Sequence, residues 1–208
     1  MEIETGAATD NPLVFTDTSE VISGGNFHGA PLAHALDYAA IVLTDLLSIS
    51  ERRLDRLVNP DSNEGLPPFL ARSAGTSSGF MMPHVTVAAL LNECKVLSHP
   101  ASTDSVPTSG GKEDHVSMGM TSALKLKKIV ENVEYGLAIE ILAAGEGLEF
   151  RLPLLGGQGV EKARKTLRTI SKPVDEDRVL SPDIEAVAKA IREGKFDSEW
   201  ESICQLVH

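Results

Sequence analysis

Four consecutive ionisable residues, Lys112-Glu113-Asp114-His115, form a dense cluster of side chains that can do chemistry. A carboxylate or imidazole in such a cluster can act as a general acid or base when burial or a neighbouring charge shifts its pKa. Charged tetrads are also common on protein surfaces, where water solvates them. The tetrad is therefore a candidate acid–base site, and a solvated surface cluster is the alternative that stays open.

A second candidate, Asn26-Phe27-His28, directly follows the pair Gly24-Gly25. Glycines allow a backbone to approach a ligand closely, but a chain leaving a tight hairpin needs the same freedom, so both interpretations stay open. The six histidines have neither an H-x-x-x-H spacing nor an adjoining cysteine or carboxylate cluster of the kind that binds metals. The sequence therefore predicts no metal site.

The charge balance excludes some classes of partner. Thirty acidic residues against nineteen basic ones give a formal net charge of -11. An acidic surface repels phosphate backbones and anionic lipid headgroups, so we expect neither nucleic-acid nor membrane partners. The richest apolar stretch, residues 39–47, contains polar residues and is shorter than the roughly eighteen uncharged residues of a membrane span.

The cysteines and the N-terminus bear on the cellular compartment. Cys94 and Cys204 lie far apart and form no C-x-x-C pair, which is typical of proteins in a reducing compartment. The acidic N-terminus is followed by no apolar run, so it resembles neither a secretory signal nor a basic transit peptide. We therefore expect a cytoplasmic protein.

Hydrophobic periodicity and prolines indicate the elements that would position the candidate residues. Two short apolar runs, 13–15 and 21–22, flank a polar turn and predict a small hairpin. Leucines and alanines then recur at helical spacing from Pro31 nearly to Pro60. Proline suits the first turn of a helix and cannot continue one, so this spacing predicts one long helix between the two prolines.

The rest of the chain is also predicted to be helical. Ser181, Pro182 and Asp183 give the last clear helix an N-cap, a first helical residue and a charge that suits the helix dipole. A final turn or two is expected within 199–207. The further helices are expected near residues 80–98, 121–149, 160–171 and 182–193.

A long polar segment, residues 98–120, separates two of these helices and contains the tetrad. Long loops inside compact helical domains are usually either functional or disordered, and composition supports both interpretations. We expect a mainly α protein, a long-helix bundle with a small N-terminal β-hairpin. Its expected divisions are a hairpin and glycine-rich loop (1–28), the bundle with its loop (29–150), and small C-terminal helices (151–208).

Several ordered motifs in this chain resemble the histidine ammonia-lyase family of aromatic amino acid lyases. The resemblance runs from about residue 8 to about Asp197. Its motifs are Asp10-Asn11-Pro12-Leu13-Val14-Phe15, Ile22-Ser23-Gly24-Gly25-Asn26-Phe27-His28, Ser50-Glu51-Arg52-Arg53, Leu66-Pro67-Pro68-Phe69-Leu70, Ser78-Gly79-Phe80-Met81, Leu97-Ser98-His99-Pro100, Asp104-Ser105, Pro107-Thr108-Ser109 and Glu113-Asp114-His115-Val116-Ser117-Met118.

The resemblance implies a helical-bundle lyase that removes ammonia from L-histidine to give urocanate in histidine catabolism. It implies a methylidene-imidazolone electrophile made from an Ala-Ser-Gly tripeptide, a tyrosine base, no metal, and a homotetramer whose subunits share active sites. Asn11 and Phe27 would line the electrophile, and Met81 would wall the substrate pocket. Glu113 would face the substrate imidazole, which can hydrogen-bond to a carboxylate, whereas an apolar ring would leave that charge unpaired.

The chain also departs from the family pattern. It contains no Ala-Ser-Gly, and the nearest strings are Thr108-Ser109-Gly110, Ser77-Ser78-Gly79 and Ile22-Ser23-Gly24. The family's tyrosine base and its Tyr-Ser-Leu-Arg segment are absent, and Lys112 stands where many relatives carry glutamine. The match corresponds to the C-terminal portion of such an enzyme, so the chain alone is expected to be inactive.

Three functional hypotheses follow, and Glu113 argues against the weakest of them, a lyase for another aromatic amino acid. In the first, the chain is part of an active lyase whose N-terminal portion, or a second chain, supplies the electrophile. In the second, it is a non-catalytic homologous subunit or truncated remnant that only binds or assembles. Either way, the apolar faces of long helices predict an oligomer.

Overall fold

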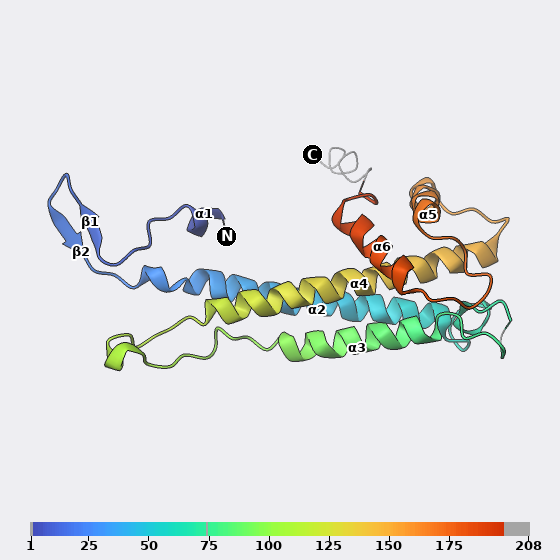
Figure 1. Ribbon diagram of the computed structural model, residues 1–208, viewed down its shortest axis with the longest axis horizontal. Helices are drawn as coiled ribbons and strands as arrows, with labels where there is room; N and C mark the ends of the chain where they lie inside the picture. Colours follow the sequence, from blue (N-terminus) through green and yellow to red (C-terminus); the bar gives the residue numbers. More distant parts are fainter. Residues whose placement is uncertain (1, 74, 198–208) are drawn as a thin grey trace. The chain divides into compact units, whose positions relative to one another are not determined.

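The computed structural model describes residues 2–73 and 75–197, and it is mainly helical, as predicted (Figure 1). The predicted turn at 199–207 lies outside the described residues, as does Cys204. The elements in chain order are α1 (Glu2–Thr5), β1 (Leu13–Phe15), β2 (Glu20–Ile22), η1 (Asn26–His28), α2 (Ala30–Val58), η2 (Pro68–Leu70), α3 (Met81–Leu97), η3 (Ser109–Gly111), α4 (Gly119–Arg151), α5 (Gln158–Ile170) and α6 (Ser181–Arg192).

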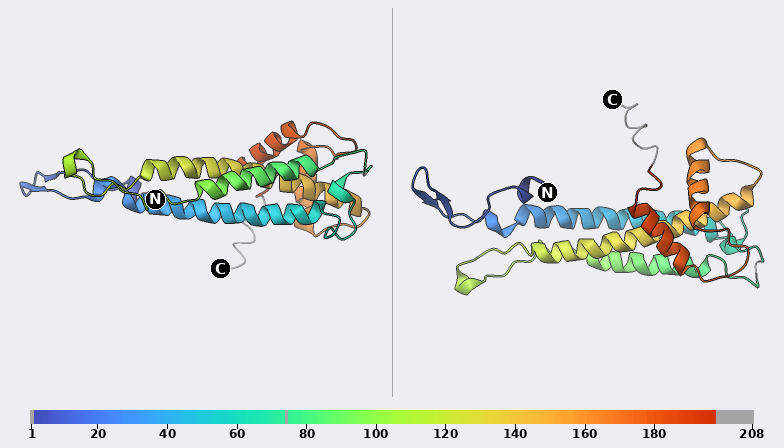
Figure 2. Two further views of the ribbon diagram at one scale, coloured as in Figure 1. Left: turned by 90° about the horizontal axis from the view of Figure 1, so that it is seen from below. Right: turned by 45° about the horizontal axis from the view of Figure 1, so that its top comes forward.

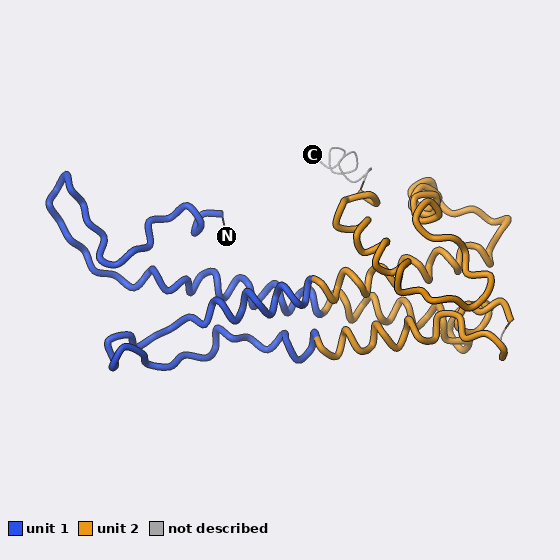
Figure 3. The backbone as a smooth tube through the Cα atoms, in the orientation of Figure 1, with its two compact units in different colours: residues 1–44, 94–130 blue, residues 45–93, 131–208 orange. Residues whose placement is uncertain are grey.

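The contacts between residues divide the chain into two compact units (Figure 3). Unit 1 comprises residues 1–44 and 94–130, and unit 2 comprises residues 45–93 and 131–208. The three long helices α2, α3 and α4 each contribute residues to both units. The division into 1–28, 29–150 and 151–208 stays a prediction.

In unit 1, β1 and β2 form the predicted hairpin, an antiparallel pair in which Leu13 lies opposite Ile22. Val14 lies opposite Val21, and the side chains of both are exposed. The one-turn helix α1, which the sequence did not predict, precedes the hairpin.

The long helices begin and end close to the predicted residues. Pro31 lies in the first turn of α2, and the helix ends two residues before Pro60. α3 ends three residues before Pro100. Apart from Ser50, the buried residues of α2 recur at alternating steps of four and three, which is the stripe that a helix presents to packed neighbours. They are Ala33, Asp37, Ala40, Thr44, Leu47, Ser50, Glu51, Leu54 and Val58.

The hydropathy of α2 bears on the expectation that the chain contains no membrane span. Segment 26–58 contains an 18-residue window with a mean hydropathy of 1.5, so by length and composition alone it could cross a membrane, contrary to the sequence expectation. A core helix of a bundle passes the same test, and α2 buries Asp37 and Glu51 beside partners on other elements. The hydropathy is therefore weak evidence for a membrane span.

In unit 2, the motif Ser50-Glu51-Arg52-Arg53 ties three helices together. Ser50 donates a hydrogen bond to Glu140 of α4 at 2.6 Å, and Arg53 pairs with the same carboxylate. Buried Glu51 lies 3.0 Å from Nε2 of His84 on α3. Burial tends to raise the pKa of Glu51, but hydrogen bonds from Arg52 and His84 lower it overall. The motif therefore holds the helices together rather than forming an open site.

Also in unit 2, α5 and α6 lie beside α4 (Figures 1 and 2). Arg168 of α5 pairs with buried Glu146 of α4 at 2.9 Å, and Arg192 of α6 pairs with Glu134 of α4 at 2.8 Å. The predicted cap of α6 was wrong by one residue, since Leu180 is the N-cap and Ser181 is the first helical residue. The Asp183 carboxylate instead accepts a hydrogen bond from Ser171 at 2.6 Å.

Candidate active site

Glu113 lies in unit 1, near the tip of the loop 98–118 that joins α3 to α4, here named the Glu113 loop. Its main chain forms an isolated antiparallel bridge with Thr108, with a Thr108 N to Glu113 O distance of 2.9 Å. Its carboxylate accepts hydrogen bonds from the hydroxyls of Ser109 at 2.8 Å and Thr108 at 3.2 Å. Side-chain and main-chain contacts thus fix the direction of this carboxylate within the loop.

The other members of the tetrad differ from Glu113. Lys112, Asp114 and His115 are exposed, whereas Glu113 is half-buried. A solvated surface cluster therefore describes three of the four side chains, and Glu113 alone is held by neighbouring hydroxyls. Among residues 2–73 and 75–197, no group of three or more histidine, cysteine, aspartate or glutamate side chains could hold a metal ion.

Phe27 lies in η1, the single 3-10 turn that follows the glycine pair. Its side chain is 39% exposed, and its ring centroid lies 4.3 Å from that of His28. Gly29 ends the turn in the left-handed conformation, after which α2 begins. The turn therefore presents an open aromatic ring at the entrance to α2.

Asn11 is joined to the same glycine-rich segment. Its side-chain Oδ1 accepts hydrogen bonds from the Ser23 hydroxyl at 3.0 Å and from the Gly24 amide at 3.2 Å. Both contacts use the carbonyl end of the side-chain amide of this exposed residue, so the two N–H donors of its amino end are not needed for them.

One hydrogen bond joins the segment of Phe27 to the Glu113 loop within unit 1. The Ser117 hydroxyl, at the C-terminal end of the loop, donates to the main-chain oxygen of His28. Ser117 is buried, and it also accepts from the Gly119 amide at 3.4 Å. The tertiary structure thus connects two stretches that lie 89 residues apart, and Asn11 is connected to the first of them.

Met81, the remaining candidate, belongs to unit 2 and is the first residue of α3. It lines a cavity of about 340 Å³ together with Pro68, Phe69 and residues 75–78. The backbone of this corner is fixed by Asp177, whose carboxylate accepts from the amides of Ser78 at 2.6 Å and Gly79 at 3.0 Å. These amides hold the pKa of Asp177 below its usual range.

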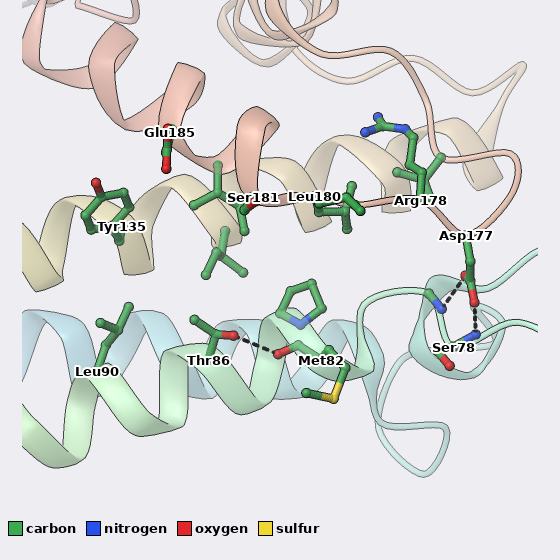
Figure 4. Close-up of a pocket in the computed structure, with 16 residues that line it drawn as sticks. Ser78, Met82, Thr86, Leu90, Tyr135, Asp177, Arg178, Leu180, Ser181 and Glu185 are labelled. Carbon is green, nitrogen blue, oxygen red and sulfur yellow. Dashed lines mark hydrogen bonds between the residues drawn. The ribbon is translucent and has the colours of Figure 1, made fainter.

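A larger pocket of about 540 Å³ also lies in unit 2, between α3, α4 and the segment that leads into α6 (Figure 4). Leu90, Tyr135, Ile139 and Ile184 give it a mainly apolar wall. None of the four residues singled out from the sequence lines it. This pocket therefore does not coincide with the residues singled out from the sequence.

Sequence reasoning missed the residues that orient Glu113. The string Thr108-Ser109-Gly110 was notable only as a near match to Ala-Ser-Gly, whereas both of its hydroxyls contact the carboxylate. Their spacing of four and five residues from Glu113 was the available signal, because a tight loop brings such residues together. The link from Ser117 to His28 had no signal in the sequence.

The chain belongs to the aromatic amino acid lyase family, whose model matches residues 1–169. Members of this family use a methylidene-imidazolone group and need no metal. The long-helix fold is that of ammonia-lyases, as predicted.

The chain is 53% identical over 207 residues to a histidine ammonia-lyase of Koribacter versatilis, covering 94% of this chain and 40% of that protein. The crystal structure of histidine ammonia-lyase from Trypanosoma cruzi is similar to this chain, with a TM-score of 0.88 and 51% sequence identity. The match covers 91% of this chain and 38% of that one. The crystal structure of tyrosine aminomutase from Streptomyces globisporus also has a TM-score of 0.88 to this chain. Its sequence is 37% identical, and the match covers 93% of this chain and 37% of that one. The chain thus spans about 40% of the length of its curated relatives.

Proposed function

We propose that this chain is the C-terminal part of a histidine ammonia-lyase, which eliminates ammonia from L-histidine non-oxidatively to give urocanate in histidine catabolism. The observation that carries the proposal is Glu113, a carboxylate held by two hydroxyls on the Glu113 loop. The fold alone does not select a substrate, since a histidine ammonia-lyase and a tyrosine aminomutase share the same TM-score. Sequence identity, at 51% against 37%, favours the first.

Glu113 would recognise the imidazole of the substrate. An imidazole N–H can donate to the carboxylate, so Glu113 would orient the ring and hold or exchange its proton. A phenyl ring offers no N–H or O–H donor, so enclosing it there would remove water from the carboxylate without replacing the lost hydrogen bond, at a cost of about 1–3 kcal/mol. Glu113 would thus be both a catalytic and a specificity-determining residue.

Asn11 and Phe27 would hold the electrophile. Their geometry fits a small planar heterocycle, because Phe27 offers an open ring and Asn11 an amide anchored through its carbonyl end. When bound, the methylidene-imidazolone supplies the electron-accepting centre that lets the amino group leave as ammonia. The sequence has no Ala-Ser-Gly, so an N-terminal lyase portion or a second chain would supply this group.

Met81 would wall the substrate pocket. It lies where a chain turn enters α3, on a backbone that Asp177 fixes through the Ser78 and Gly79 amides. A methionine side chain adapts its shape and adds apolar contact without competing for hydrogen bonds. It would therefore pack against the substrate through apolar contact.

The assembly would be a homo-oligomer of the tetramer type in the cytoplasm, with neither nucleic acid nor membrane as partner. Exposed apolar side chains along α2 support association, because such faces are normally covered. They are Tyr38, Ile41, Val42, Leu46 and Ile49. The net charge of -11 argues against nucleic-acid and lipid partners.

Intact-mass spectrometry of the purified protein, combined with an absorbance assay for urocanate, tests the proposal. We expect a second component that carries Ala-Ser-Gly and is lighter by two waters than its sequence, together with turnover of L-histidine. A single 22.2 kDa species without turnover would favour the non-catalytic homologous subunit instead.

Within the active assembly, Glu113→Gln tests the role of the carboxylate. Removing a charge-assisted hydrogen bond should lower kcat/KM for L-histidine by about 10–100-fold, since such bonds contribute about 1.5–3 kcal/mol. Asp114→Asn, an exposed neighbour that loses the same charge, is the matched control and should change kcat/KM little. Equal effects of the two substitutions would contradict the assignment.

A further inference from the structure

The Glu113 loop begins beside a cavity in unit 1. This cavity, of about 520 Å³, is lined by the end of α3, the start of the loop and the start of α4, including His99, Asp104 and Lys125. A segment that borders open space gains little from packing, so its position depends on polar contacts. The contacts of the first arm of the loop, residues 98–104, are therefore informative.

Asp37 of α2 makes one of these contacts. Its side chain is almost completely buried, with 3% of the residue exposed. Oδ2 accepts a hydrogen bond from the Ser102 amide at 2.7 Å, across 65 residues of chain. Asp37 thus fixes a main-chain group of the first arm from the buried face of a long helix.

Lys125 of α4 makes the matching contact. Its Nζ lies 3.3 Å from Oδ1 of Asp37, and it also donates to the main-chain oxygen of His99. Asp37 therefore binds a donor of the arm, the Ser102 amide, and Lys125 binds an acceptor, the His99 carbonyl. One turn of chain between these two points is held from two helices.

The charge state of Asp37 agrees with this arrangement. Burial tends to raise the pKa of Asp37, but the Ser102 amide and the neighbouring side chains of Ser122 and Lys125 lower it overall. The residue is therefore an ionised, paired carboxylate at neutral pH. Buried pairs of this kind add little net stability compared with apolar residues of similar size, so geometry is the better explanation of what they contribute.

The C-terminal end of the loop, its second arm, which includes Val116 and Ser117, is held by other contacts. Ser105 Oγ accepts from the Val116 amide at 3.0 Å, which ties the two arms together. Ser117 donates to the His28 oxygen. With these links in place, the orientation of the tip that carries Glu113 depends on where the first arm is fixed.

We propose that Asp37 and Lys125 are positioning residues, a buried pair that holds the first arm of the Glu113 loop so that the Glu113 carboxylate meets the substrate in a productive orientation. Its catalytic consequence rests on the proposed function, because it requires Glu113 to contact the substrate. Its structural part, the fixing of the arm, does not.

Hydrogen exchange of the whole 208-residue chain tests the structural part. In Asp37→Leu/Lys125→Met both charges are replaced by apolar groups of similar size, which buried pairs tolerate without loss of global stability. We expect amides of residues 99–105 to exchange about tenfold faster or more, while amides in α5 and α6 are unchanged. Exchange in 99–105 equal to that of the parent chain would overturn the proposal.

Two further variants test whether faster exchange in residues 99–105 reflects a general loss of stability. Asp37→Asn keeps an acceptor for the Ser102 amide and should loosen the arm less than Asp37→Leu does. Glu134→Gln/Arg192→Met removes an ion pair between α4 and α6 in unit 2 and should leave exchange in 99–105 unchanged. If this control loosened the arm as much as the double variant, a general loss of stability would replace positioning as the explanation.

Kinetics of the active assembly test the catalytic part. Because displacing a catalytic group by about an ångström can cost about 100-fold, kcat/KM for L-histidine should fall about 10–100-fold in Asp37→Leu/Lys125→Met, mostly in kcat. If Glu113→Gln is impaired while the double variant matches the parent, the positioning role fails and the proposed function stands. If Glu113→Gln matches the parent, the proposed function fails, and hydrogen exchange alone then decides whether the pair fixes the arm.

Discussion

Two buried carboxylates, one in each unit, are held in different ways. Asp37 in unit 1 is contacted at both oxygens, by the Ser102 amide and by Lys125, and its pKa is lowered. Glu146 in unit 2 is 1% exposed, and Oε1 pairs with Arg168 at 2.9 Å. Among the described residues neither Glu146 Oε2 nor Asp37 Oδ1 has a hydrogen-bond partner, although Asp37 Oδ1 lies 3.3 Å from Nζ of Lys125. Burial raises the pKa of Glu146 against the opposing effect of Arg168.

The difference teaches what each buried charge is suited to do. Asp37 contacts a loop amide, so its charge defines the position of a segment that packing does not hold. Glu146 contacts Arg168, which also pairs with Glu149 at 2.9 Å, so it belongs to a network that clamps α5 onto α4. Arg168 is the positive group that pairs directly with the buried Glu146 carboxylate, and the dependence of Glu146 on it leads to the largest expected effect.

Arg168→Met should be the most destabilising of these substitutions. It leaves Glu146 buried without its partner, and breaking such a pair costs about 3–5 kcal/mol in the free energy of unfolding. Denaturant titration of the purified chain measures this value. Glu146→Gln is the matched control, because it removes the charge together with its desolvation cost, and we expect a much smaller loss. Similar losses in both variants would show that Glu146 does not need Arg168.

Two left-handed glycines extend the comparison between a packed corner of unit 2 and the open loop of unit 1. Gly79 has a φ of +52°, and a Cβ there would lie 2.4 Å from the main-chain oxygen of Phe69. Gly110 has a φ of +67°, with nothing within 4 Å of a Cβ. Gly79→Ala should therefore cost about 2–5 kcal/mol, from backbone strain plus overpacking, and Gly110→Ala about 1–2 kcal/mol from strain alone.

Thermal unfolding of both glycine variants beside the parent chain gives the ranking. A smaller loss for Gly79→Ala than for Gly110→Ala would contradict the close approach of Phe69 to this turn. That result would also show that the turn at Gly79 in unit 2 is no more tightly packed than the loop at Gly110 in unit 1.

The two carboxylates should respond to pH with opposite signs, the smallest of the expected effects. Asp37 has a lowered pKa, so its contribution to stability is present above its unfolded pKa of about 4 and is lost as pH falls through the folded value. Glu146 has a raised pKa, so its contribution is present below its unfolded pKa, also about 4, and is lost as pH rises through the folded value.

The free energy of unfolding, measured from neutral to acidic pH, tests these signs. Asp37→Asn should lose less stability on acidification than the parent chain, because it removes a contribution that acid abolishes. Glu146→Gln should lose more, because it removes a contribution that acid restores. Shifts of the same sign in both variants would end the distinction between the two sites.

The elements of this fold were largely predictable because their causes are local. Pro31, Pro60 and Pro100 mark helix boundaries through the geometry of a single residue, and the spacing of leucines and alanines gives the helices between them. The exceptions lie at helix ends, where Leu180 rather than Ser181 caps α6, and in the four-residue helix α1. Such short or terminal features depend on one or two contacts that a periodic pattern does not record.

The sequence by itself determined the helices, the hairpin, the family and the candidate residues Asn11, Phe27, Met81 and Glu113. Only the tertiary structure decided which groups hold them. Asp37 reaches Ser102 across 65 residues, Ser117 reaches His28 across 89, and Asp177 reaches Ser78 across 99. Each contact joins a side chain to a main-chain group, and every residue type carries that same main-chain group. The sequence therefore does not show which main-chain group each side chain will bind, and the packing of the long helices decides it.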